Sequence, residues 1–137
     1  MTSQAYIYPL LDQKGRFKHK CKQQALTSND IFDDFIFFAC DHFKIKYRDF
    51  ISKKRFKHLV EARQWVCYYY REYCNEYKIY PLSLTDMGKR MGNRDHATII
   101  HSIKTMAVTL EWAWVGKRIE LSNAYGIYLQ INNLNND

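Results

Sequence analysis

Polar side chains able to form directed hydrogen bonds gather at residues 92–102, where a turn passes into a helix that is polar at its start and apolar further on. Gly92 and Asn93 can adopt the positive φ that ends one helix and redirects the backbone. Behind them come Arg94, Asp95, His96 and Thr98. These residue types predict recognition of base edges, since an arginine that grips a guanine through two donors contributes about 1–3 kcal/mol of discrimination.

The elements around this stretch must hold it in place. Apolar residues recur at the three-and-four spacing of a buried helical stripe, namely Ile99, Ile100, Ile103, Met106 and Leu110. Upstream, Ser83 and Asp86 fit a capping box and predict a short helix over residues 84–91. Two helices joined at Gly92 have the order and loop length of a helix-turn-helix, whose second helix presents its first side chains to the major groove. The pattern alone leaves an ordinary helical hairpin open.

The distribution of charge favours a nucleic-acid-binding function over an ordinary helical hairpin. The 137-residue chain has 21 Lys and Arg against 14 Asp and Glu, which gives a net charge of +7 and a pI of about 9.2. The excess is concentrated between residues 44 and 71, which hold only Asp49 and Glu61 against Lys44, Lys46, Arg48, Lys53, Lys54, Arg55, Lys57, Arg63 and Arg71. A basic surface beside a helix-turn-helix predicts binding to a polyanion, with an affinity that falls steeply as salt rises.

At this point the chain resembles a known family, the C-terminal DNA-binding domain of the bacterial replication initiator DnaA. The family signature Gly-Gly-Arg-Asp-His-Thr-Thr-Val-Leu-His is similar to residues 92–101, and residues 50–64 are similar to its basic loop and the start of its long helix. The resemblance extends over about residues 31–106. It implies double-stranded DNA as the partner.

The resemblance also implies which residues touch DNA. Arg94, Asp95, His96, Ala97 and Thr98 would lie in the major groove, and Arg55 would reach the adjacent minor groove. Lys53 and Lys54 directly precede Arg55, and Lys53→Ala is expected to weaken binding to all DNA sequences about equally. Arg63 and Arg71 match DNA contacts on the long helix, and eight positions apart they would share a face; Ser83 matches a position near the DNA backbone. The complete set of predicted DNA-binding residues is Lys53, Lys54, Arg55, Arg63, Arg71, Ser83, Arg94, Asp95, His96, Ala97 and Thr98.

Two departures from the family pattern matter. Ala97 stands where the family has a threonine that helps to read bases, so the DNA target need not be the initiator's own. Residues 74–81 look like an insertion before the Ser83 cap, which would alter the tilt of the helix-turn-helix on DNA. The family's ATPase module is also missing, because no phosphate-binding loop of the Gly-x-x-x-x-Gly-Lys-Ser/Thr type occurs in the sequence.

The predicted fold is an all-α helix-turn-helix bundle in three parts. Residues 1–27 form an arm or a short hairpin turning at residues 12–15, two alternatives that remain open. Residues 28–107 form the helix-turn-helix domain, with a first helix from Ser28 or Asn29 and a long helix over residues 57–76. Residues 108–137 are a helical extension, in which the reading helix continues to Gly116 and a second segment covers residues 118–129.

Other function classes find little support in the sequence. Neighbouring helical residues such as Asp95 and His96 diverge by about 100° and cannot pair as acid and base, and no nucleophile with a base and an orienting group is found. The four cysteines lack zinc-type spacing, so we expect neither cofactor nor metal, and Cys40 and Cys67 read as core residues. Without a membrane-spanning segment or signal peptide, we expect a cytoplasmic, nucleoid-associated protein of a bacterium or a phage.

Two questions about partners stay open. The aromatic residues beyond position 108 either cover the domain's own core or form a homodimer surface, since helix-turn-helix proteins often read paired half-sites. The alternative function is a protein-interaction module that binds or antagonises the replication initiator or another replication protein, or a transcriptional regulator.

Overall fold

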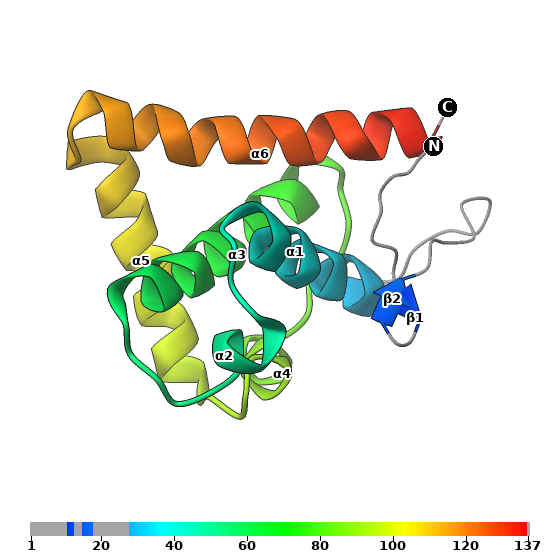
Figure 1. Ribbon diagram of the computed structural model, residues 1–137, viewed down its shortest axis with the longest axis horizontal. Helices are drawn as coiled ribbons and strands as arrows, with labels where there is room; N and C mark the ends of the chain where they lie inside the picture. The colour runs from blue at the N-terminus through cyan, green and yellow to red at the C-terminus, as the bar shows by residue number, and fades with distance from the viewer. Residues whose placement is uncertain (1–10, 13–14, 18–27, 137) are drawn as a thin grey trace.

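The computed structural model describes residues 11–12, 15–17 and 28–136, and in this part of the chain helices dominate (Figure 1). The elements are β1 (Leu11–Asp12), β2 (Gly15–Phe17), α1 (Ser28–His42), α2 (Tyr47–Phe50), α3 (Lys57–Glu76), α4 (Leu84–Arg90), α5 (His96–Trp112) and α6 (Val115–Asn136). The all-α fold predicted from the sequence is confirmed, and α3 has the predicted bounds.

The long helix α3 is the centre of the core. Its side chains Trp65, Val66 and Tyr70 are completely buried. Helix α1 packs against it through Phe32 and Phe35, whose rings meet Tyr70 edge-on with centroids 4.8 and 6.1 Å apart. Aromatic rings at helical spacing therefore fill the interior rather than forming a surface on which bases could stack.

Helix α4 is attached to α1 by a charge-assisted contact. The Arg90 guanidinium donates from Nη1 to both carboxylate oxygens of Asp33, at 2.9 and 2.8 Å. Burial raises the pKa of Asp33 more than the nearby Arg90 lowers it. Met87 and Met91 are buried beneath the helix and its end. Helix α4 thus rests on the core by one side and leaves the other side exposed.

Helix α6 lies across one side of the bundle, over α1 and α3 (Figure 1). Tyr128 stacks on Phe35 with ring centroids 4.0 Å apart, and Tyr125 stacks on Tyr69 at 4.5 Å. Lys117 forms an ion pair with Glu61 of α3 at 2.7 Å. Of the two alternatives for the C-terminal aromatic residues, these tyrosines cover the domain's own core.

The break between α5 and α6 comes earlier than predicted. Helix α5 ends at Trp112, Ala113 is extended, and α6 begins at Val115 rather than after Gly116. A β-carbon on Gly116 would overlap the Trp114 ring, so that ring folds back over the first turn of α6. The sequence pattern missed the corner because apolar spacing continues through it.

Near the N-terminus, β1 and β2 pair antiparallel, with Leu11 opposite Phe17 and Asp12 opposite Gly15. This pairing is the hairpin alternative that the sequence left open. Residues 1–10, 13–14 and 18–27 of the predicted arm or hairpin lie outside the described residues.

Candidate nucleic-acid interface

The turn between α4 and α5 depends on two glycines. Gly92 has a φ of 90° and Asn93 a φ of 61°, which confirms the predicted left-handed turn. A β-carbon on Gly92 would overlap the main-chain oxygen of Ile51, and one on Gly88 would overlap that of Arg94. The turn therefore packs closely against both the chain after α2 and its own return.

Both helices of the motif begin with side-chain caps. The Ser83 hydroxyl accepts from the Asp86 amide at 3.1 Å, as the capping box predicted. In α5 the cap is Asp95, whose Oδ1 accepts from the amide and the hydroxyl of Thr98, both at 3.0 Å. These bonds lower the pKa of Asp95. The first helical residue is thus His96, and Arg94 and Asp95 precede the helix, with Asp95 as its cap.

The start of α5 is open on its outer side and anchored on its inner side. His96, Ala97 and Thr98 are exposed, whereas Ile99 and Met106 are completely buried. His101 and Lys104 continue the exposed face at helical spacing. The predicted apolar stripe holds for Ile99 and Met106, with Ile103 and Leu110 partly buried against the core.

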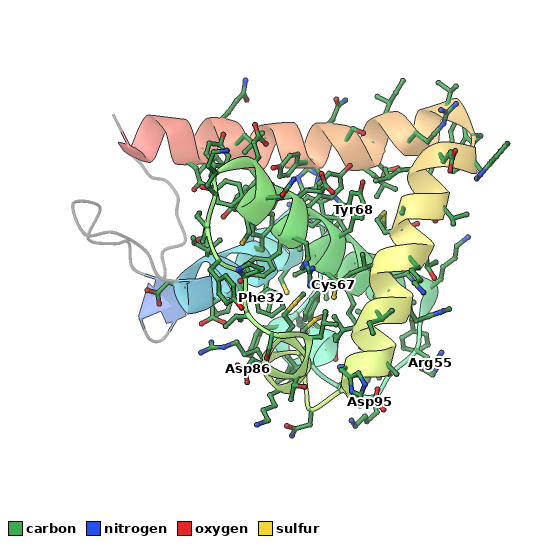
Figure 2. All side chains as sticks on the ribbon, turned by 180° about the vertical axis from the view of Figure 1, so that it is seen from behind. Phe32, Arg55, Cys67, Tyr68, Asp86 and Asp95 are labelled. Atoms are coloured by element: carbon green, nitrogen blue, oxygen red, sulfur yellow. The ribbon has the colours of Figure 1, made fainter. Side chains whose placement is uncertain are left out.

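A basic loop, residues 52–56, lies beside the turn. Lys53 donates from Nζ to the main-chain oxygen of Gly92 at 3.2 Å. Lys54 pairs with Asp49 at 3.0 Å, and Arg55 is exposed. In Figure 2, Arg55 and Asp95 lie along the same edge of the molecule. The structure therefore brings the loop and the start of α5 together, although they are some forty residues apart in sequence.

Arg63 differs most from its expected place. Its side chain is only 5% exposed, and its guanidinium donates to four main-chain oxygens, those of Phe50 at 2.7 Å, Lys54 at 2.9 Å, Asp49 at 3.0 Å and Ser52 at 3.1 Å. Desolvation, followed by the charges of Arg94 and Arg55, lowers the pKa of Arg63 to about 10. Arg63 therefore stays charged at neutral pH. The predicted exposed face shared by Arg63 and Arg71 is not formed, because Arg63 is buried and Arg71 is half-buried further along α3.

Arg94 is also bound within the protein. It is half-buried, and its guanidinium donates from Nη1 to the main-chain oxygen of Met91 and from Nη2 to that of Ser52, the latter at 2.7 Å. Desolvation is the largest influence on its pKa, which is lowered. In this arrangement both terminal nitrogens of the guanidinium already donate one hydrogen bond each to a main-chain carbonyl.

Several exposed cationic or polar side chains around this surface were not among the predicted DNA-binding residues. Lys57 and His58 begin α3 beside the basic loop, and the Phe56 and His58 rings stack with centroids 6.1 Å apart. His101 and Lys104 extend the outer face of α5. The last two could have been found, because they follow His96 and Ala97 at helical intervals.

The described residues offer little for other chemistry. They contain no group of three His, Cys, Asp or Glu side chains able to hold a metal ion. Burial raises the pKa of Cys40 and that of Cys67 to about 12, so both thiols stay protonated in the core. Within the same residues no helix is long and apolar enough to cross a membrane.

Known proteins match the part of the chain that carries this surface. The family model described as the bacterial dnaA protein helix-turn-helix matches residues 33–106. The chromosomal replication initiator protein DnaA of Geotalea daltonii is 41% identical over 73 residues, which cover 53% of this chain and 15% of that protein. The corresponding protein of Bacteroides thetaiotaomicron is 34% identical over 79 residues, or 58% and 16%.

The chain thus spans about a sixth of the length of these relatives. The matched residues run from the middle of α1 to the middle of α5 and include the basic loop, the turn and the exposed start of α5. On this match and on its fold, the chain belongs to the family of bacterial DnaA helix-turn-helix domains.

Proposed function

We propose that the protein binds double-stranded DNA with sequence specificity, reading the major groove with the start of α5 and the minor groove with Arg55. One observation carries the proposal: the basic loop and the exposed start of α5 are held side by side, as the bond from Lys53 to the oxygen of Gly92 illustrates. The major and minor grooves of B-form DNA lie next to each other, so two adjacent segments of the protein can contact one duplex through base edges and phosphates.

The exposed residues divide by the contacts they can make. His96, Ala97 and Thr98 face outward at the first turn of α5 and are proposed to meet base edges. Phosphate contacts are proposed for Lys53, Lys54, Arg71 and Ser83, the last through a hydroxyl that caps α4 as an acceptor and can still donate. Because alanine offers only a methyl contact, Ala97 favours a thymine methyl at its position.

The relatives suggest the process in which such binding takes place. They are named chromosomal replication initiator proteins. We therefore propose a role in replication initiation or its regulation, in a bacterium or a phage, at the nucleoid. Transcriptional regulation would use the same surface and differ only in where the target sites lie.

Selection of bound sequences from a randomised duplex pool tests specificity directly. The expected result is one enriched motif, whose consensus changes with His96→Ala. Lys53→Ala should weaken all duplexes alike and reduce the salt slope by about one. Lys78→Ala is the matched control, since Lys78 is exposed beyond the far end of α3, roughly 30 Å from the loop by helix rise. Binding without an enriched motif would contradict sequence-specific recognition.

A second exposed surface supports a homodimer. Side chains at the corner between α5 and α6 are large, apolar and exposed, with Trp112 at 76% and Trp114 at 75%; the others are Val108, Val115 and Ile119. Exposed tryptophans are typical of interfaces. Sedimentation should show a dimer that Trp112→Ala with Trp114→Ala dissociates. A wild-type monomer at all concentrations would instead favour a replication protein as the occupant of this corner.

A further inference from the structure

Two arginines from different elements meet at one carbonyl. The main-chain oxygen of Ser52 accepts from Nη2 of Arg63 at 3.1 Å and from Nη2 of Arg94 at 2.7 Å. Arg63 belongs to α3 and Arg94 to the turn before α5. We propose that these two arginines are positioning residues that lock the basic loop and the start of α5 into a single unit of fixed spacing. The inference rests on the proposed function only for its consequence on DNA.

The guanidinium of Arg63 is suited to this task by its shape. It carries five N–H donors in a fixed fork, and they bond to four main-chain oxygens, two at the end of α2 and two within the α2–α3 connection. A lysine has the same charge but a single nitrogen, so it cannot satisfy acceptors that lie in four directions. Leaving buried carbonyls without donors is costly, which makes the loop conformation depend on this one side chain.

The second arginine extends the lock to the turn. Arg94 bridges the oxygens of Met91 and Ser52, so a single side chain spans from the end of α4 to the basic loop. A second bond joins the same two segments with the roles reversed, since Lys53 of the basic loop donates to the main-chain oxygen of Gly92 in the turn. Because the two segments are already held in place, they need not become ordered when they contact two grooves. Binding then loses less conformational entropy than it would with a flexible loop.

Hydrogen exchange in the DNA-free full-length chain tests the lock itself. The amides of Ile51 and Ser52 donate to the main-chain oxygens of Tyr47 and Asp49 in α2, at 3.1 and 3.2 Å, and the Lys54 amide donates to the Ser52 hydroxyl at 3.2 Å. Arg63→Lys and Arg94→Lys should each make these three amides exchange faster, while amides in the middle of α3 keep their protection. Arg71→Lys is the matched control for exchange in the DNA-free protein, because Arg71 is half-buried on the same helix and its replacement should leave the exchange of these three amides unchanged. Unchanged exchange in both variants would overturn the proposal.

A double-mutant cycle tests the consequence for DNA. In the wild-type background Arg55→Ala should weaken binding about tenfold, the scale of one base contact. With Arg63→Lys already present, Arg55→Ala should cost less than about threefold, because the loop no longer presents Arg55 in register. Equal costs in the two backgrounds would indicate that Arg63 and Arg55 act independently and would overturn positioning.

The two proposals fail in different ways. If wild-type protein does not bind duplex DNA, the proposed function is wrong, but the exchange result still decides whether the lock exists. If Arg63→Lys prevents folding, as circular dichroism would show, Arg94→Lys carries both measurements, since Arg94 is more exposed and makes fewer bonds. Faster exchange with unchanged helicity supports the inference.

Discussion

The indole N–H of Trp65 donates to the main-chain oxygen of Leu121, 3.0 Å away, and so joins the central helix α3 to α6. Leu121 lies beyond the residues that match the family, which end at 106. Trp65 is completely buried and also packs against Phe35 and Phe38 of α1. Helix α6 is therefore part of the core of this chain and not an appendage to it.

The first prediction concerns this bond. Trp65→Phe removes both the indole donor and part of a packed ring, so it should lower the free energy of unfolding by about 1–3 kcal/mol. Urea denaturation measures the change. Tyr80→Phe is the control, since Tyr80 is 90% exposed and its replacement should change stability by less than about 0.5 kcal/mol. Equal effects of the two substitutions would mean that α6 does not cover Trp65 in solution.

The second prediction contrasts two glycines within helices. Gly88→Ala should destabilise the protein by about 1–3 kcal/mol or more, because the added carbon would overlap the main-chain oxygen of Arg94. Gly126→Ala should stabilise it by about 0.5–1 kcal/mol, since nothing lies near that position in α6 and alanine favours the helix. Thermal unfolding of both variants checks the opposite signs. A neutral Gly88→Ala would show that α4 and the start of α5 are further apart.

Most of the fold could be predicted because apolar periodicity, capping residues and turn residues within each helix mark where the helix lies. The bounds of α3 follow from apolar periodicity, and the turn follows from Gly92 and Asn93. The corner after Trp112 was not predicted, since it arises from packing of the Trp114 ring over Gly116 and from contacts of α6 with α3. Such contacts between distant residues have no signature in a single sequence.

For the candidate site, the sequence predicted which segments meet but not which arginines remain free. The cationic composition of residues 44–71 pointed to the basic loop, and the loop does lie beside the turn. Charge alone cannot distinguish an exposed arginine such as Arg55 from Arg63, which is buried among carbonyls. The distinction depends on three-dimensional hydrogen bonds from α3 back to the end of α2.

The third prediction concerns a residue that sequence reasoning overlooked. Lys104 is exposed two turns beyond His96 on the same face of α5. If the start of α5 enters the major groove, Lys104 should reach a flanking phosphate, and Lys104→Gln should weaken binding to every duplex with a salt slope lower by about one. Lys117→Gln is the control, because Lys117 lies in the first turn of α6, beyond the C-terminal end of α5, where it pairs with Glu61 of α3. Loss of sequence preference in Lys104→Gln would instead assign it a base contact.

The last prediction is a pH dependence at the start of α5. Hydrogen bonds from the Thr98 amide and hydroxyl lower the pKa of Asp95 below the ordinary value of 3.8. A carboxyl whose folded-state pKa is depressed stabilises the fold fully above its unfolded pKa, and this contribution is lost as pH falls through the folded value.

Asp95→Asn keeps a capping oxygen at every pH but has no proton to gain. The stability of the wild type relative to this variant should therefore be highest near neutral pH and decline below about pH 4. Urea unfolding at pH 7, 5 and 3 measures the difference. Thr98→Val removes the hydroxyl donor and keeps the amide, so in that background the decline should be smaller. A difference that does not vary with pH would mean that the Asp95 carboxylate does not cap α5.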